Sequence, residues 1–359
     1  WRAAMPGDLD AEEAAAQRAE ALDQLDEAAA LAQGVIDTDP QRIGANLVLA
    51  RIERDRAPEA AVQRLASLSE QPLPASLRRS VGILHGALLD SLGRCEDAAR
   101  VWLQSYLPAE GEPPAGLPLP GFLPAGPALA AEAPRGADAR LLWPLPGTPA
   151  VALCKALQPA TQILIDRFGP ETRRDGLGPL RPNAGHHGEQ GADALWRERL
   201  AARGRSPEQV VDVLPHVDAA LRSALPDARL LVFIADPRDL LLNWIAFGSL
   251  QGYQMPPAEA LAEWLDAALD VLAQERASAP ERLHLLSAEA LEQDAAGALA
   301  EALRFYGLEG TPGEYAPTTI GQGPALRLPA GRWRAYAEGP LAAAFARLGA
   351  RAEAFGYAA

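Results

Sequence analysis

The chain has 359 residues, and its 33 Lys and Arg residues against 47 Asp and Glu residues give a formal net charge of −14. Apolar residues make up 48% of the sequence, which is typical of a globular protein and excludes a disordered or fibrous one. A chain with this charge repels nucleic acid and anionic lipid, so we expect no nucleic-acid partner. No run of about 18 apolar residues occurs, so we also expect no membrane span.

The two cysteines, Cys95 and Cys154, lie far apart and lack the spacing of metal ligands. So few cysteines favour a reducing compartment, and we expect a cytoplasmic protein without a structural disulfide or a metal site. The chain begins at Trp1 and not at a methionine, from which we expect that it was trimmed at this end.

Residues 1–107 predict an all-helical domain, because from residue 8 onward apolar residues recur at three-to-four spacing. Three helix pairs align when Ala28, Ala61 and Ala98 take equivalent small positions, 33 and 37 residues apart. A period near 34 residues resembles the tetratricopeptide repeat, in which small residues let paired helices approach. We therefore expect a tetratricopeptide-like array, with a generic helical bundle as the alternative.

Residues 108–139 differ in composition, and eleven prolines fall between positions 108 and 149. That density forbids regular helix and predicts a semi-rigid connector at a domain boundary.

From residue 140 onward, short apolar runs alternate with helical stretches, which predicts a parallel sheet flanked by helices. The predicted strands are 141–145, 162–166, 230–235 and 283–287. The predicted helices are 192–203, 210–224, 239–250, 258–277 and 288–306. Ligands of such sheets bind at the carboxyl ends of the strands, so the residues that follow each run are candidates for a site.

Asp236-Pro237-Arg238-Asp239 follows the apolar run 230–235 directly. Asp236 is a suitable N-cap and Pro237 suits the first helical turn, while Arg238 and Asp239 can simply pair on the surface. The alternative is an anion site, because a helix N-terminus presents unpaired N–H groups and a positive dipole end.

The segment VVDVLPHVDAALRSALPDARLLVFIADPRDLLLN (210–243) resembles the sulfotransferase family, especially bacterial members joined to tetratricopeptide repeats. The matching positions are Asp212, Pro215, Pro226, Ala228, Arg229, Asp236, Pro237, Arg238 and Asp239. Segments 283–309, 331–336 and 355–357 also look like parts of this family. The resemblance implies a sulfotransferase-like α/β domain, with a P-loop-like parallel sheet flanked by helices, over residues 140–359.

The resemblance further implies a donor, 3′-phosphoadenosine 5′-phosphosulfate (PAPS), whose sulfuryl group is transferred to a hydroxyl. Family motifs carried onto this chain give Asp166 as the catalytic base. They give Gly147, Thr148, Arg238, Asn243, Arg332, Trp333 and Arg334 as donor-binding residues. The alternative for the last three is that Trp333 packs into the core and its arginines lie on the surface.

The donor motifs depart from the family pattern at several positions. Departures are Leu145, Pro146, Pro149, Val213, Ala235 and Asn243. Three of them replace a cation, and losing three charged hydrogen bonds weakens binding by roughly 4–9 kcal/mol if the losses add. Each proline also removes a backbone N–H that an anion would need.

Other candidates are weaker. Loop 181–191 holds His186, His187 and Glu189, and adjacent histidines point apart, which favours a loop over a metal site. For His216 we expect packing or exposure to solvent.

Two functions remain open. The first is a degenerate sulfotransferase-like protein, a pseudoenzyme that binds a protein or glycan partner through its repeats and cleft. The second is an active PAPS-dependent sulfotransferase acting on a hydroxyl of a peptide, glycan or small molecule. A transferase or hydrolase with a less charged substrate is a third hypothesis.

Overall fold

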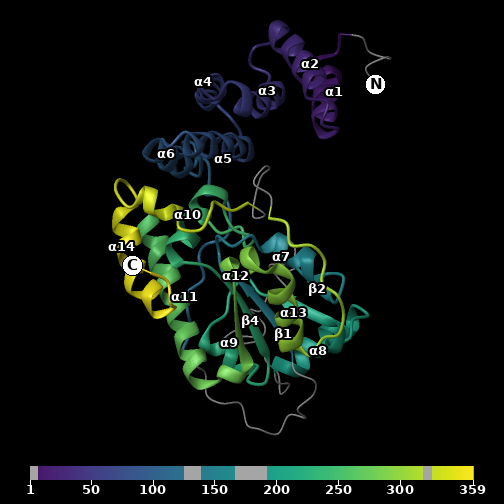
Figure 1. Cartoon of the computed structure of the whole chain (residues 1–359), viewed down its shortest axis with the longest axis vertical. Coiled ribbons are helices and arrows are strands. Elements are labelled where there is room, and N and C mark those ends of the chain that lie inside the picture. Colours follow the sequence, from purple (N-terminus) through teal and green to yellow (C-terminus); the bar gives the residue numbers. More distant parts are fainter. Residues whose placement is uncertain (1–6, 125–138, 166–191, 318–325, 359) are drawn as a thin grey trace. The chain divides into compact units, whose positions relative to one another are not determined.

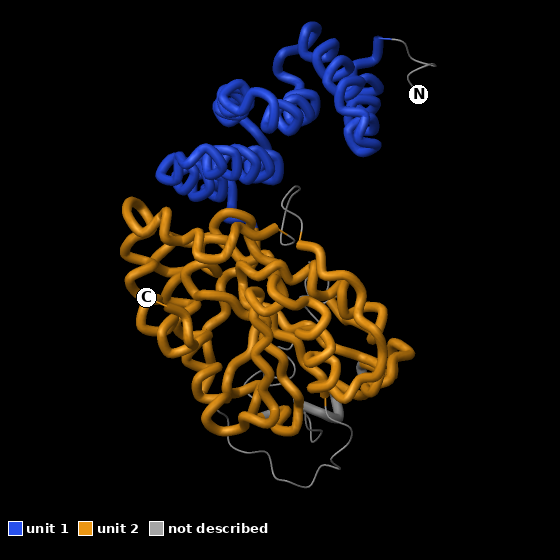
Figure 2. Tube along the Cα trace, in the orientation of Figure 1, with its two compact units in different colours: residues 1–115 blue, residues 116–359 orange. Residues whose placement is uncertain are grey.

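The computed structural model describes residues 7–124, 139–165, 192–317 and 326–358 (Figure 1). The chain divides into two compact units, residues 1–115 and residues 116–359 (Figure 2). The division falls inside the predicted connector, so that residues 116–124 belong to the second unit.

The described part of the first unit is entirely helical and consists of three successive helix pairs. The helices are α1 (Leu9–Ala21), α2 (Leu25–Thr38), α3 (Ile43–Arg56), α4 (Pro58–Ser69), α5 (Ala75–Ser91) and α6 (Cys95–Ser105). Ala28, Ala61 and Ala98 each occupy the fourth position of the second helix of a pair, and all three are fully buried. The predicted helical array is confirmed, and its assignment to the tetratricopeptide repeat stays a prediction.

Close packing within the third pair depends on a glycine. A Cβ atom added to Gly86 of α5 would lie 2.1 Å from Nε1 of Trp102 on α6. Trp102 is fully buried, so the ring fills the space that the missing side chain leaves. The first two pairs are joined by a bidentate ion pair from Arg51 to Glu20, at 2.5 and 2.6 Å.

The second unit contains a five-stranded, all-parallel sheet in the order β2-β3-β1-β4-β5. The strands are β1 (Arg140–Pro144), β2 (Gln162–Leu164), β3 (Val210–Val213), β4 (Arg229–Ile234) and β5 (Leu283–Ser287). Four of them confirm predicted strands. Within the register of β1 and β4, Leu141 lies beside Leu230 and Trp143 beside Val232, all fully buried.

The prediction of one helix over residues 210–224 is wrong in its first part. Val210–Val213 forms the strand β3, and only Ala219–Ala224 is helical, as α9. Three β-branched valines in four residues favour a strand, and β3 is buried throughout because β1 and β2 flank it. The buried Asp212 within it accepts a hydrogen bond of 2.9 Å from the indole of Trp196.

Helices cover the sheet on both faces. They are α7 (Ala150–Leu157), α8 (Ala192–Ala202), α10 (Pro237–Phe247), α11 (Ala258–Ser278), α12 (Ala288–Gln293), α13 (Ala295–Tyr306) and α14 (Ala342–Ala354). Right-handed crossovers place α7 on one face and α9 to α11 on the other, because β1 to β2 crosses the sheet in the opposite direction to β3 to β4. On the first face α13 contacts α7, and on the second α14 packs on α10 and α11.

The predicted helix 288–306 is two helices, because Asp294 ends α12 and caps α13 by accepting from the N–H of Gly297 at 2.9 Å. Among the helices of the described ranges, none combines the length and the apolar character needed to cross a bilayer. Even the 21-residue α11 is interrupted by charged residues.

Candidate functional site

The strand order locates the crevice of the sheet. In parallel α/β sheets, ligands bind outside the carboxyl ends of strands, where the order of connections reverses. Here the connection from β1 leads towards β2, and that from β3 leads across β1 towards β4. The carboxyl ends of β1 and β3 therefore define the crevice, and the ends of β4 and β5 lie beside it.

The loop that follows β1 bonds to itself and to β4. The N–H of Leu145 donates to the carbonyl of Phe233 at 3.0 Å. Both the N–H and the hydroxyl of Thr148 donate to the carbonyl of Leu145, at 3.1 and 2.7 Å. Thr148 is 4% exposed, so its two donors are satisfied inside the protein.

The same loop lies tightly against the helix α10. Gly147 has φ +87°, and a Cβ atom at this position would lie 2.0 Å from the carbonyl oxygen of Leu240. Every residue from 141 to 150 is buried, and the two prolines of the loop, Pro146 and Pro149, carry no N–H. Gly147 and Thr148 are thus placed in a turn that is sealed from solvent.

The corner after β4 confirms the predicted cap. Asp236 caps α10 by accepting from the N–H of Arg238 at 2.9 Å, and Pro237 takes the first helical position. The same carboxylate holds the guanidinium of Arg238 in a bidentate pair, at 2.9 and 2.8 Å. Arg238 is 3% exposed and Asp236 is 6% exposed, so the pair is buried and the predicted surface pairing of Arg238 with Asp239 does not occur.

Trp333 covers this ion pair. The guanidinium carbon of Arg238 lies 3.8 Å from the centre of the Trp333 ring, and that of Arg334 lies 4.9 Å from it. Arg238 also donates to the carbonyl of Ala358. Cation–π contact and two acceptors therefore hold Arg238 with its donors turned to groups of the chain itself.

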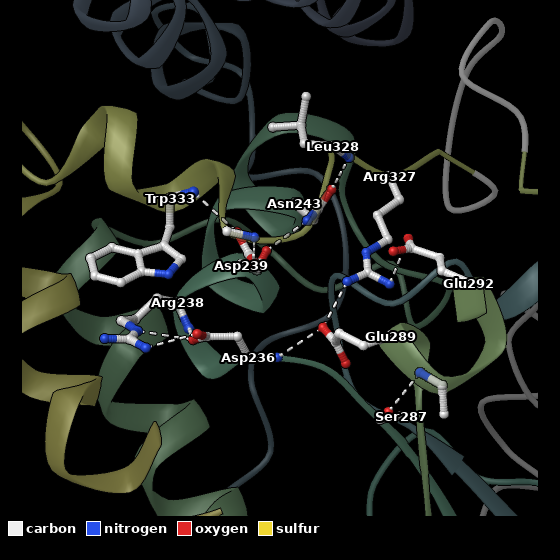
Figure 3. A network of polar contacts seen from close by, with 12 residues as sticks. Asp236, Arg238, Asp239, Asn243, Ser287, Glu289, Glu292, Arg327, Leu328 and Trp333 are labelled. Atoms are coloured by element: carbon white, nitrogen blue, oxygen red, sulfur yellow. Dashed lines mark hydrogen bonds and ion pairs between the residues drawn. The ribbon is translucent and has the colours of Figure 1, made fainter. Parts of the chain in front are cut away.

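Asp239 fills a backbone anion nest in the C-terminal segment (Figure 3). Its carboxylate accepts from the N–H of Gly331 at 2.5 Å and from the N–H of Trp333 at 3.0 Å. Gly331 has φ +77°, the left-handed conformation that turns successive N–H groups towards one point. The carboxylate thus stands where an external anion would receive these two donors.

Burial raises the pKa of Asp239 to about 6, because its carboxyl is fully buried. The charge of Asp236 raises it further. The bonds from Gly331 and Trp333 and the charge of Arg327 act in the other direction, since they stabilise the ionised form.

Asn243 ties the next turn of α10 to the same C-terminal segment. Its amide donates to the carbonyl of Asp239 at 2.7 Å, and its oxygen accepts from the N–H of Leu328 at 2.7 Å. Both hydrogen bonds are buried, so the side-chain amide of this predicted donor-binding residue is bonded to other groups of the chain.

The end of β5 adds a second neutralised cation. Arg327, 8% exposed, pairs with Glu289 at 2.8 Å and Glu292 at 3.1 Å, both on α12. Glu289 also reaches the N–H of Asp236, at 3.5 Å. Figure 3 shows these residues beside the Asp236–Arg238 pair in one polar network.

The remaining predicted site residues differ in their exposure to solvent. Arg332 and Trp333 are half-buried in the 3-10 turn Arg332–Tyr336, and Arg334 is exposed. Asp166, the predicted base, lies outside the described residues, as do His186, His187 and Glu189. No metal-binding group of three His, Cys, Asp or Glu side chains is found in the ranges that the structure describes.

The corner as a whole carries more acid than base. Four carboxylates, from Asp236, Asp239, Glu289 and Glu292, surround the buried guanidinium groups of Arg238 and Arg327. Opposite charges at 4 Å interact by about 4 kcal/mol at an effective dielectric constant of 20. A multiply charged anion would have to displace such partners, so the arrangement suits a closed structural network better than anion binding.

Sequence reasoning missed Glu289, Glu292 and Arg327. Glu289 lies two residues beyond the strand β5, and a polar side chain at the carboxyl end of a strand is a signal that could have marked it as a candidate. Nothing in the sequence links it to Arg327, 38 residues later. His216 lies in the crevice itself, 2% exposed, with Nε2 3.5 Å from Asp218. Of the two expectations for His216, packing and exposure to solvent, the structure shows packing.

Comparisons with known proteins give little. No protein-family model matches the chain, and no curated protein matches it. Among solved structures it is similar to a crystal structure of a sulfotransferase from Alicyclobacillus acidocaldarius, at 14% sequence identity and a TM-score of 0.34. The match covers 61% of this chain and 96% of that one. At this identity and score it carries no argument about function.

Proposed function

We propose that the chain is a degenerate sulfotransferase-like protein that acts by binding a protein or glycan partner and does not transfer sulfate. The observation that carries the proposal is that the corner supplies its own anions. Asp239 fills the nest of Gly331 and Trp333, and Asp236 holds Arg238 on two oxygens.

The loop after β1 supports the same conclusion. In the resemblance, this loop cradles the phosphosulfate with backbone N–H groups and a cation. Here Leu145 stands in place of the cation, Pro146 and Pro149 lack an N–H, and Thr148 is bonded to Leu145. The residues present do not fit PAPS, so we derive no transfer step for this chain.

The free-energy costs argue against binding of the donor PAPS. Breaking a buried ion pair by removing one partner costs about 3–5 kcal/mol, and a ligand phosphate that took Arg238 would leave Asp236 in that state. The loss adds to the roughly 4–9 kcal/mol expected from the three missing cations. Together they come to about 7–14 kcal/mol, which equals or exceeds most of the binding free energy of a micromolar ligand, about 8 kcal/mol.

Calorimetric titration with adenosine 3′,5′-bisphosphate, the product of the donor, tests the proposal. We expect no heat of binding at millimolar ligand, with an active sulfotransferase as the positive control and adenosine as the uncharged control. Low-micromolar binding would contradict the proposal and favour the second hypothesis, in which Arg238, Asn243, Arg332 and Arg334 hold a rearranged donor.

A further inference from the structure

The crevice at the ends of β1 and β3 is occupied by the chain itself. Residues 116–123, with the sequence GLPLPGFL, come from the predicted connector and belong to the second unit. We call this segment the strap. Its residues are half-buried or exposed, whereas Tyr253, Trp264 and His216 beneath it are 5%, 6% and 2% exposed. The strap therefore lies on a wall that the α/β unit has built.

The strap begins by pairing its backbone with the loop after α10. Leu117 forms a parallel β-bridge with Tyr253, in which its N–H donates to Gly252 at 2.9 Å and its carbonyl accepts from Gln254 at 2.7 Å. Gly116 has φ +102°, and a Cβ atom there would lie 2.6 Å from the carbonyl of Gly252. The two backbones are thus in direct contact, as when a peptide adds to a sheet edge.

The middle of the strap uses a second recognition mode. The indole N–H of Trp264 donates to the carbonyl of Pro120 at 2.9 Å. Prolines keep a segment extended and remove its own N–H donors, so their carbonyls are offered to aromatic donors of a groove.

The end of the strap inserts an aromatic side chain. The ring of Phe122 lies 4.6 Å from that of His216 and 5.2 Å from that of Trp264. The N–H of Leu123 then donates to Asp218 at 3.3 Å. The contacts follow the strap in order, from Tyr253 through Trp264 to His216 and Asp218. One surface therefore binds the backbone, a proline carbonyl and an aromatic ring of the strap.

The wall has polar capacity that the strap does not use. The indole N–H groups of Trp143 and Trp244 and the side-chain oxygen of Gln251 are buried without a hydrogen-bond partner in the described part of the chain. Gln251 is 2% exposed and both indoles are fully buried. Buried donors and acceptors are normally satisfied, so these groups indicate a place for water or for a polar group of a ligand.

We propose that the groove lined by Tyr253, Trp264 and His216 is a binding site for extended peptides. Such peptides carry a proline two residues before an aromatic residue, as Pro120 and Phe122 are spaced in the strap. The strap occupies the groove as an intramolecular ligand, and a partner peptide of the same chemistry displaces the strap. This inference does not depend on the donor site, because the groove shares no residue with the network of Asp236 and Asp239.

The test uses the full chain and a labelled peptide of sequence GLPLPGFL, followed by fluorescence anisotropy. The wild type should bind weakly, because a tethered segment competes at an effective concentration in the millimolar range. Phe122→Ala loosens the strap and should tighten peptide binding about tenfold or more, since the open fraction sets the apparent affinity. Pro124→Ala, at an exposed position just beyond the strap, is the matched control and should resemble the wild type.

Specificity is tested in the Phe122→Ala background. Adding Trp264→Phe keeps an aromatic ring but removes the donor to Pro120, and should reverse the gain in affinity. The proposal would be overturned if Phe122→Ala and the wild type bound the peptide with equal affinity, or if a scrambled peptide bound equally well. It would also be overturned if a glycan bound and the peptide did not.

A measurement on the wild type guards against a variant that fails to fold. Excess peptide should raise the rate at which thermolysin cleaves within residues 116–123, because displaced strap becomes accessible. An unchanged cleavage rate at millimolar peptide would refute the inference, whether or not adenosine 3′,5′-bisphosphate binds.

Discussion

Asp239 gives the sharpest prediction, because its charge state is linked to the stability of the C-terminal turn. The pKa of this carboxyl is raised from 3.8 to about 6, chiefly by burial. The folded protein therefore holds the proton more tightly than the unfolded chain does. Stability from this group is fully present below pH 3.8 and is lost as the pH rises through 6.

The size of the effect follows from the two pKa values. A difference of about 2 corresponds to about 3 kcal/mol, since each pKa unit is 1.36 kcal/mol. Asp239→Asn removes the titration while keeping an oxygen that accepts from Gly331 or Trp333. We compare the free energy of unfolding of the wild type with that of the variant. The difference, wild type minus variant, should fall by up to about 3 kcal/mol between pH 4 and pH 7.

Urea unfolding followed by tryptophan fluorescence measures this difference, because five of the seven tryptophans lie in residues 116–359. Subtracting the variant cancels the other carboxylates of the corner. Hydrogen exchange of the Gly331 and Trp333 amides reports the same change locally. A flat difference, or one that rises with pH, would refute the account in which burial outweighs the hydrogen bonds of the nest and raises the pKa of Asp239.

Three further predictions concern stability, each measured by unfolding. Gly147→Ala should destabilise the α/β unit by about 3 kcal/mol, because its Cβ would meet the Leu240 carbonyl at a positive φ; a loss below 1 kcal/mol would contradict the sealed loop. Arg238→Met should cost about 3–5 kcal/mol by leaving Asp236 unpaired, and adding Asp236→Asn should recover part of it. The pKa of His85 is lowered from 6.5 to about 4 by burial, so the helical unit should lose about 3 kcal/mol as the pH falls through this range, and His85→Leu should abolish the loss.

Local chemistry could be predicted from the sequence, and long-range pairing could not. Asp236 and Pro237 form a cap whose partners lie within two residues, so the residue types alone predict it. The partners of Asn243 and Asp239 lie 85 to 94 residues away, in a segment with no recognisable element. Residue types and spacing do not link the two stretches, because hydrogen-bond pairing depends on the fold. The family resemblance assigns Arg238, Asn243 and Trp333 to one site, but it does not predict these hydrogen bonds.

The strand β3 shows how periodicity fails for short elements. Four residues, Val210–Val213, are fewer than the window over which a two-residue and a three-to-four-residue repeat can be told apart. Because the helix α9 begins only six residues after Val213, the sequence pattern predicts one helix over both segments. Proline density in residues 108–139 predicts an extended segment, but it does not predict that residues 116–123 lie on the wall of Tyr253 and Trp264.

Two places along the carboxyl edge of the sheet are occupied by side chains or segments of the chain, but the occupying groups are held with different strength. At the ends of β4 and β5, buried charges such as Arg238 and Arg327 are matched by carboxylates, and removing any one leaves another uncompensated. At the ends of β1 and β3, the strap is held by one ring, Phe122, and by a few hydrogen bonds, of which only the one from Leu123 to Asp218 involves a charged group. Neutral hydrogen bonds contribute about 1 kcal/mol each, so the strap is the contact that a partner can exchange for its own. We therefore propose the crevice as the place of the binding function and the charged corner as the rigid support beside it.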